Sequence, residues 1–211
     1  SVDGGNISEQ KLIADMALSK GQLSLVVFTN HPYMIKDFGP KTPYMVPREY
    51  YGALGNIQLL KEYFYRAAAR LDLYHNFYKV DENGVFSFEG PIYTYQLDEK
   101  SLAEAVPKVN ETALDEYKQL VHAARSHGAK LVGLIPPIYS EAYIPYKDDY
   151  DNYFKLMSDL FLPHERIINF NLPLYSKYTD DVSNFYGSVH LSPKGAEIFS
   201  LEFASQIDSL L

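Results

Sequence analysis

The sequence predicts an α/β fold in which a central parallel sheet lies between two layers of helices. Helical and strand patterns alternate along the chain, as they do where crossover helices join parallel strands. The three predicted strands are short and almost wholly apolar, which is typical of parallel strands covered on both faces. The length of 211 residues suits one domain with a sizeable core. We therefore expect a single three-layer α/β/α domain over residues 1–211.

The first helix is predicted over residues 9–19, after a turn-rich opening. Ser8 is the expected N-cap, because its hydroxyl can accept a hydrogen bond from the first turn. The expected buried face consists of Leu12, Ile13, Met16 and Ala17. The apolar run 23–29 then predicts the first strand, which ends at Asn30. Ligands bind at the carboxyl ends of strands in open parallel sheets, so this corner is a candidate wall of a site.

The middle of the chain predicts a helix over residues 56–73 and then a small insertion over about 74–96. Asn83-Gly84 is a strong hairpin signal, because both residue types tolerate the positive φ angles of a tight turn. The insertion should therefore contain a β-hairpin with strands over 77–80 and 85–88.

The second half of the chain continues the alternation. A helix is predicted over 110–127, with Asn110 as its cap, and a buried strand over 129–135 that Pro136-Pro137 halts. A further helix over 148–162 and a third strand over 166–170 follow. A tyrosine-rich loop over 174–186 leads to the last helix.

The stretch 185–196 places His190 in a short loop just before that last helix. Ser192 is a good N-cap, and Pro193 suits the first helical position because its missing N–H would be unpaired there. The apolar stripe that would dock the helix on the sheet includes Ala196, Phe199, Ala204 and Ile207. His190 is therefore presented from a rigid support, although a histidine that only packs near the helix start has the same pattern.

The run His-Leu-Ser-Pro-Lys-Gly-Ala from His190 resembles the C-terminal signature of SGNH/GDSL-type hydrolases, whose fold is flavodoxin-like. It is most similar to the exported members that deacylate or acylate polysaccharides and cell-wall polymers. In that family the histidine is the general base and an aspartate three residues earlier orients it. Here that earlier position is Gly187. Asp180 or Asp181 could reach His190 from the preceding loop instead, and Asp181 is the candidate orienter.

The resemblance also implies where the oxyanion donors and the nucleophile would lie. The opening Ser-Val-Asp-Gly-Gly-Asn resembles the family's second block, so Gly4 or Gly5 would supply a backbone donor. Asn30 occupies the place of the family's third block, whose asparagine side chain also donates; the alternative is a turn residue that bonds the local backbone. No Gly-x-Ser block precedes the first helix. The resemblance therefore implies a serine upstream of Ser1, or a relative that has lost it.

Composition narrows the classes of partner and cofactor. The net charge is −8 with no basic cluster, which argues against nucleic acid or an anionic membrane surface. No apolar run approaches the roughly 20 residues of a membrane span. The chain has no cysteine, so disulfides and thiolate metal sites are excluded, and its histidines show no metal-ligand spacing. We expect no cofactor and no metal.

The chain contains 19 tyrosines and no tryptophan. Tyrosine offers a flat apolar face with a polar tip, which suits sugar stacking as well as half-buried packing. Tyr33, Tyr139 and Tyr186 are the candidates for contact with a carbohydrate.

Three hypotheses about function remain at this stage. The resemblance implies an extracytoplasmic domain that hydrolyses or transfers acyl esters of a carbohydrate or cell-wall polymer, with His190, Asp181, Asn30 and Gly5 as the site. The second hypothesis is a non-catalytic descendant of that fold, kept as a glycan-binding or assembly module. The third is a flavodoxin-like domain that binds an unrelated small molecule. It predicts no clustering of Asn30 with His190, whereas the first two hypotheses require it.

Overall fold

The computed structural model describes residues 7–21, 23–39, 78–80, 86–88, 102 and 106–208. The chain divides into two compact units. The first unit consists of Ser1–Gly39 with Tyr93–Leu211, and the second of Pro40–Ile92. The first contains the parallel sheet, and the second contains the hairpin that the sequence predicts within an insertion.

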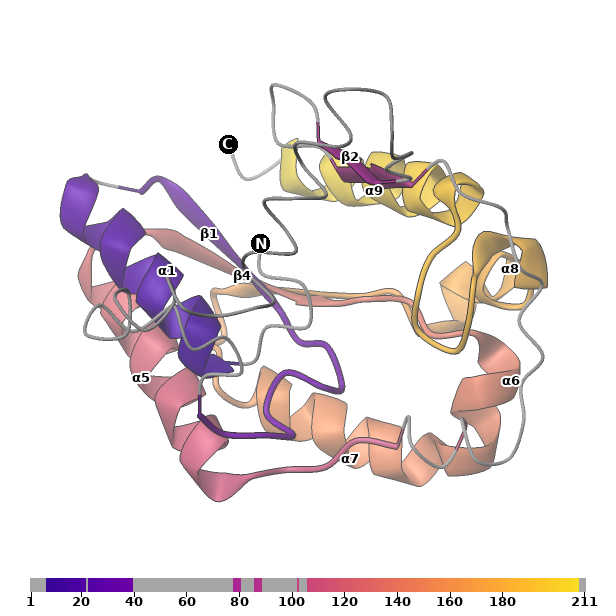
Figure 1. Ribbon diagram of the computed structural model, residues 1–211, viewed down its shortest axis with the longest axis horizontal. Helices are drawn as coiled ribbons and strands as arrows, with labels where there is room; N and C mark the ends of the chain where they lie inside the picture. The colour runs from indigo at the N-terminus through magenta and orange to yellow at the C-terminus, as the bar shows by residue number, and fades with distance from the viewer. Residues whose placement is uncertain are drawn as a thin grey trace, which may run out of the picture. The chain divides into compact units, whose positions relative to one another are not determined.

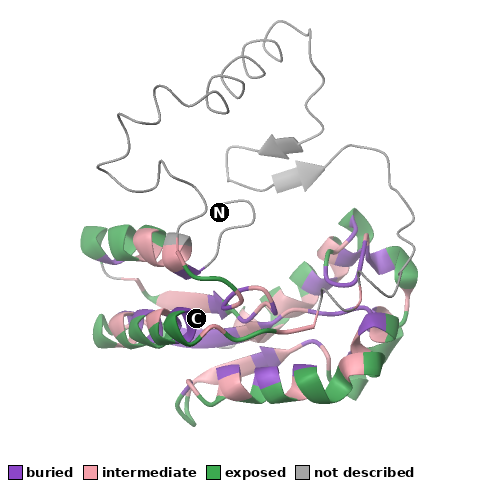
Figure 2. Cartoon of the chain, turned by 60° about the horizontal axis from the view of Figure 1, so that its bottom comes forward, coloured by how far each residue is buried: buried purple, intermediate pink, exposed green. Residues whose placement is uncertain are grey.

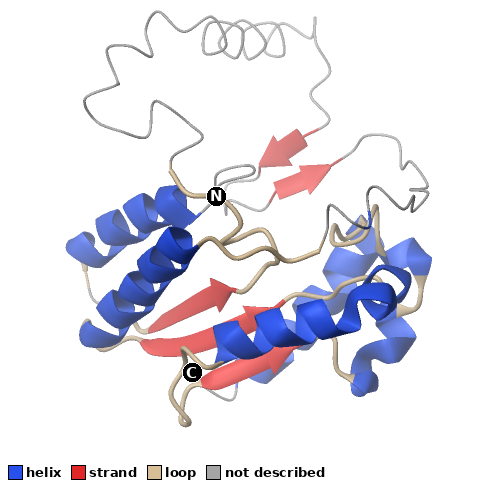
Figure 3. Ribbon diagram, turned by 90° about the horizontal axis from the view of Figure 1, so that it is seen from below, coloured by secondary structure: helices blue, strands red, loops and turns tan. Residues whose placement is uncertain are grey.

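The first unit is built on a three-stranded parallel sheet, which confirms the predicted α/β class (Figure 3). Its strands are β1 (Leu25–Thr29), β4 (Lys130–Ile135) and β5 (Arg166–Asn169), in the order β1-β4-β5. Val27 pairs with Val132, and the register continues without a slip along both strand pairs. Each strand lies within two residues of its predicted ends, because a short apolar run admits few alternatives.

One face of the sheet is covered by α5 (Glu111–Ser126) and α7 (Lys147–Ser158) (Figure 1). Phe28 on β1 is the clearest marker of this layer. Its ring centroid lies 5.8 Å from that of Tyr117 on α5 and 6.0 Å from that of Phe161, just after α7. Buried and exposed residues alternate along both helices, as expected for helices with one covered face (Figure 2).

The opposite face is covered by α9 (Pro193–Ile207), the last helix of the chain (Figure 1). Phe199 is buried, and its ring centroid lies 5.3 Å from that of Phe170, which follows β5. The predicted apolar stripe is only partly right. Ala204 is exposed, and the half-buried Phe203 packs against the core instead.

Helix α1 (Ile7–Lys20) packs against α5, but not with the predicted face (Figure 1). Ile7 and Leu18 are its buried apolar residues, whereas Ile13 is 41% exposed and Met16 is 60% exposed. Apolar side chains occur on every side of this helix, so periodicity alone does not select one face. The contact with α5 makes that selection.

The predicted cap of α1 is also wrong. Ser8 lies inside the first turn of the helix, and its hydroxyl accepts a hydrogen bond from the Gly39 N–H at 3.2 Å. The other predicted caps are confirmed. Asn110 accepts from the Ala113 N–H at 3.1 Å, and Ser192 accepts from the Gly195 N–H at 3.1 Å. Within the described ranges, every helix is too short or too polar to cross a lipid bilayer.

The second unit contains a two-stranded antiparallel hairpin. Its strands are β2 (Tyr78–Val80) and β3 (Phe86–Phe88), with Lys79 paired to Ser87. This confirms the hairpin that Asn83-Gly84 predicts. The helix predicted over 56–73 lies outside the described residues.

Short helical turns follow β4 and β5, and those after β5 replace most of the loop predicted over residues 174–186. They are α6 (Ser140–Tyr143), η3 (Ile144–Tyr146), η4 (Pro173–Tyr175), α8 (Ser176–Thr179) and η5 (Val182–Asn184). Figure 1 draws α6 and α8 next to each other, and the Ser140 hydroxyl lies 3.1 Å from the Thr179 hydroxyl. These turns gather polar side chains at the carboxyl edge of the sheet.

Candidate functional site

Asn30 lies fully buried at the carboxyl end of β1, where the sequence predicts a site wall. Its N–H donates to the Leu134 carbonyl at 2.6 Å, which extends the pairing with β4. Its side-chain Oδ1 accepts a hydrogen bond from the Tyr117 hydroxyl on α5. Its Nδ2 is buried and has no hydrogen-bond partner among the described residues. Asn30 is therefore held through a distant helix rather than through the local backbone, and it keeps one unused donor.

His31 follows Asn30 and is fixed by aromatic residues. Its Nδ1 accepts from the Tyr33 N–H at 3.3 Å, and the two rings lie 5.1 Å apart. The His31 carbonyl accepts from the Tyr153 hydroxyl on α7 at 2.8 Å. Burial, together with a smaller contribution from the nearby charge of His190, lowers the pKa of His31 to about 4. Both effects keep the His31 imidazole neutral at pH 7.

His190 thus lies close to the end of β1, on the loop that precedes α9. A single antiparallel bridge between Phe185 and Leu191 closes this loop, and the Tyr186 N–H donates to the His190 carbonyl at 2.8 Å. The His190 side chain is exposed. A histidine that only packed under the helix would be covered, so the loop presents this imidazole to solvent.

The loop of His190 is also fastened to the segment after β4. The Tyr139 N–H donates to the Ser188 carbonyl at 2.9 Å, and the Tyr139 ring lies 5.6 Å from that of Phe185. Residues from the ends of β1 and β4 and from the last loop therefore meet along one edge of the sheet.

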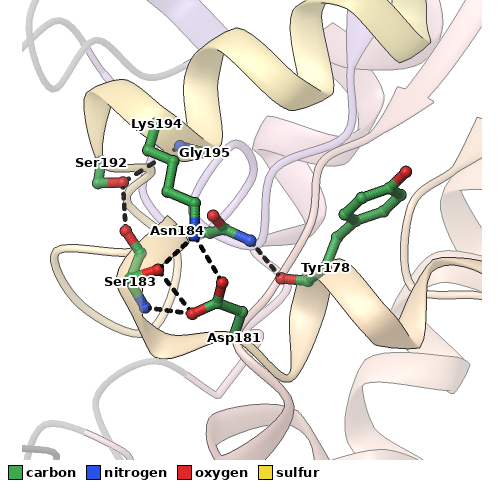
Figure 4. A network of polar contacts seen from close by, with 7 residues as sticks. All are labelled: Tyr178, Asp181, Ser183, Asn184, Ser192, Lys194 and Gly195. Carbon is green, nitrogen blue, oxygen red and sulfur yellow. Dashed lines mark hydrogen bonds and ion pairs between the residues drawn. The ribbon is translucent and has the colours of Figure 1, made fainter.

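Asp181, the candidate orienter of His190, has other partners (Figure 4). One carboxylate oxygen accepts from the Ser183 N–H at 3.0 Å and from the Ser183 hydroxyl at 2.6 Å. The other accepts from Lys194 Nζ at 2.7 Å. The Lys194 hydrogen bond is the main reason that the pKa of Asp181 falls to about 2. No hydrogen bond joins Asp181 to His190 in the described part of the chain, and the carboxylate instead anchors the start of α9.

The start of α9 also contacts the backbone of Ser183 and Asn184, and Figure 4 draws the Ser192 hydroxyl bonded to Ser183 and Gly195. The Ser192 N–H donates to the Asn184 carbonyl at 2.9 Å, and the Ser192 hydroxyl donates to the Ser183 carbonyl at 2.7 Å. A Cβ placed on Gly195 would lie 2.0 Å from the Asn184 carbonyl oxygen. Only glycine allows the helix to approach this closely, and the contact fixes the end of the His190 loop.

A pocket of about 570 Å³ opens between the segments that follow β4 and β5. Its polar lining includes Ser140, Asp151, Asn169, Asn171, Thr179 and Asp180. Asn171 holds the two segments together, because its Oδ1 accepts from the Ile138 N–H at 2.8 Å and its Nδ2 donates to the Pro136 carbonyl at 2.9 Å. The pocket therefore has a rigid floor at the carboxyl edge of the sheet, where α/β proteins bind ligands.

The structure distributes the predicted site residues unevenly. It brings His190 close to the segment of Asn30, and Tyr33 and Tyr186 lie along the same edge. Tyr139 is buried in the core, and Gly5 lies outside the described residues. The tyrosine that lines the pocket is Tyr143, which the sequence did not single out.

Sequence reasoning missed His31 as well as the pocket. The signal for His31 was its place directly after a strand end, beside Asn30. The pocket depends on short helical turns that carry no periodic pattern of their own. No cluster of three or more His, Cys, Asp or Glu side chains that could hold a metal ion occurs among the described residues.

No protein-family model, curated protein or solved structure matches this chain.

Proposed function

We propose that this chain is an SGNH-type α/β domain that acts outside the cytoplasm on acyl esters of a carbohydrate or cell-wall polymer, by deacylation or acyl transfer. The observation that carries the proposal is an exposed His190 whose charge acts on His31, the residue that follows the fully buried Asn30 at the carboxyl end of β1. The motif that begins at His190 supports the family assignment, and the absence of cysteine suits an exported protein.

In this proposal, His190 is the general base. Its imidazole takes the proton of a serine hydroxyl as the serine oxygen attacks the ester carbonyl carbon, and it returns that proton to the departing alcohol. Asn30 would donate through Nδ2 to the oxygen on which negative charge develops, because this donor has no partner among the described residues. Gly5 would add a backbone donor. No serine hydroxyl of the described residues hydrogen-bonds to His190, so the attacking serine is left for the labelling experiment below to identify.

The second candidate is a non-catalytic glycan-binding or assembly module with the same fold. One specific observation favours it. Both oxygens of Asp181 are engaged by Ser183 and Lys194, and Gly187 stands where the family has the orienting aspartate. His190 therefore lacks a described carboxylate partner, which a general base in a triad uses to fix its tautomer.

The test is labelling with a fluorophosphonate probe, followed by peptide mass spectrometry. Wild type should be labelled on one serine, and His190→Ala should lose labelling by at least about 100-fold, because a general base contributes roughly 10²–10⁴ in rate. His122→Ala is the matched control, since His122 is exposed on α5 and should leave labelling unchanged. Absence of labelling in wild type, or equal labelling in His190→Ala, would refute the hydrolase proposal and leave the binding module.

A further inference from the structure

The pocket between the segments after β4 and β5 has the lining of a ligand site, and its groups are distinct from those proposed for ester chemistry. Its volume of about 570 Å³ falls within the roughly 300–1,000 Å³ of small-molecule sites. Neither His190 nor Asn30 lines it. What it binds can therefore be argued from its own residues, without reference to catalysis.

One wall of the pocket offers hydrogen-bond acceptors. Asp180 is exposed, and one of its carboxylate oxygens accepts from the Ser140 hydroxyl. Its other oxygen accepts no hydrogen bond from the described residues. Thr179 and Ser176 add hydroxyl groups beside it. This wall therefore suits a ligand that donates several hydrogen bonds.

A second part of the lining combines a carboxylate with an aromatic ring. Asp151 accepts hydrogen bonds from the Tyr143 hydroxyl and from Lys147. Burial raises the pKa of Asp151, but these two hydrogen bonds outweigh it, so the pKa is lowered and the group is ionised. The Lys147 ammonium also lies 5.8 Å from the centre of the Tyr143 ring. Lys147 is therefore already paired with Asp151 and Tyr143, which line the same pocket.

The rim of the pocket is apolar and exposed. Ile144 is 66% exposed, Leu172 is 46% exposed, and Pro173 lies beside Leu172. Apolar surface that rims a polar pocket fits a ligand with both hydroxyl groups and C–H faces. Sugar rings have this combination, because their hydroxyl groups lie around the edge of an apolar ring face.

The charges of the lining disfavour anions and leave one carboxylate without an opposite charge. Two carboxylates and one ammonium leave the pocket negative, which disfavours phosphate and other anions. Lys147 already pairs with Asp151, so a cation would find only Asp180 without an opposite charge. We propose that this pocket binds a neutral saccharide unit, with Asp180 as the principal acceptor of its hydroxyl groups and the rim of Ile144 and Leu172 against its apolar face. The proposal does not rest on ester chemistry at His190.

Titration of the ¹⁵N-labelled protein with cellobiose and with the disaccharide of N-acetylglucosamine tests this proposal. Saturable amide shifts should be confined to residues 138–151 and 169–180, and at least one of the two disaccharides should produce them. Asp180→Asn should weaken binding about tenfold, because hydrogen bonds to charged acceptors are the stronger ones. Leu172→Ala should weaken it several-fold.

The controls keep this result separate from the fate of the proposed hydrolase. Asp159→Asn changes an exposed carboxylate near the far end of α7 and should bind as wild type does. Both Asp180 and Leu172 are exposed, so their replacement leaves the core intact. Shifts absent with both disaccharides, an unchanged affinity in Asp180→Asn, or tighter saturation of the same amides by spermidine would overturn the assignment. The fluorophosphonate result does not enter any of these outcomes.

Discussion

Replacing Gly195 by alanine tests how the last helix positions the candidate site. A Cβ built at this position lies 2.0 Å from the Asn184 carbonyl oxygen and 2.8 Å from the carbonyl carbon. Real Cβ atoms essentially never approach closer than 3.0 Å, so the separation must grow by about 1 Å. Both of the opposing atoms belong to the backbone, and no side chain can rotate away to relieve the contact.

The size of the effect follows from what this displacement breaks. Overpacking of a dense site costs about 1–3 kcal/mol, and a lost N-cap costs about 1 kcal/mol more. The displacement strains the Ser192 cap and its N–H bond to Asn184, so we expect Gly195→Ala to destabilise the fold by about 2–4 kcal/mol. For a chain of this length, that corresponds to a fall in Tm of roughly 5–15 °C.

Urea unfolding followed by far-ultraviolet circular dichroism, together with a thermal melt, measures this change. Gly21→Ala is the matched control. A Cβ on Gly21 meets nothing within 4 Å, and the residue has no positive φ, so the stability should stay within about 0.5 kcal/mol of wild type. Equal stability of Gly195→Ala and wild type would refute the close approach of α9 to Asn184.

Three further measurements follow from the buried groups. Tyr117→Phe should destabilise the fold by about 1–3 kcal/mol in urea unfolding, because it leaves Asn30 Oδ1 buried without its donor; a variant as stable as wild type would contradict this hydrogen bond. Arg125 Nε donates to Glu165 at 2.7 Å and lowers the pKa of that carboxylate, so this pair should stabilise the fold above about pH 4.3, and stability should fall as the pH drops below that value. Glu165→Gln should lack this acid limb in unfolding measured from pH 7 to pH 3. The pKa of His31 is lowered to about 4, so the contribution of its neutral ring to the free energy of unfolding should be complete above about pH 6.5 and should decline from there toward pH 4. A His31 ring proton that titrates near pH 6.5 by NMR would show that the ring is not buried as described.

The sequence predicted those parts of the fold that depend on local patterns. The sequences of β1, β4 and β5 are so apolar that burial on both faces of a parallel sheet is the arrangement that removes most of their surface from water. Asn110 and Ser192 cap their helices as expected, because a cap needs only the side chain and the first turn.

The predictions that differ from the structure concern contacts between segments that are far apart in the sequence. Packing against α5 determines which face of α1 is buried. Ile13 and Met16 are therefore exposed, although their spacing suits the buried face of a helix. Lys194 takes a carboxylate oxygen of Asp181 across 13 residues, and no spacing rule indicates that competition for the aspartate. Asp181 was selected because it lies close to His190 along the chain. In the structure, the Asp181 carboxylate pairs instead with Lys194 at the start of α9.

The pocket escaped prediction for a different reason. Much of its lining lies on short turns whose residues resemble those of an ordinary polar loop, and only the folded arrangement brings Ser140 within reach of Asp180. The tyrosine content indicated contact with carbohydrate, but it did not indicate which ring would face a cavity.

All the residues that line the pocket lie between positions 138 and 180 of the sequence. Asn30 and His31, in contrast, follow β1, the first strand of the sheet along the chain. In the described sheet, β1 pairs with β4 alone, and the Asn30 amide is tied to Leu134 at the last rung of that pairing. A local opening that peels β1 from β4 would therefore disperse the corner around His31 and leave the pocket assembled. In that partly open state the corner around His31 would be lost and the pocket would be kept. Amide hydrogen exchange that is faster at Asn30 than at Ile138 would indicate this state.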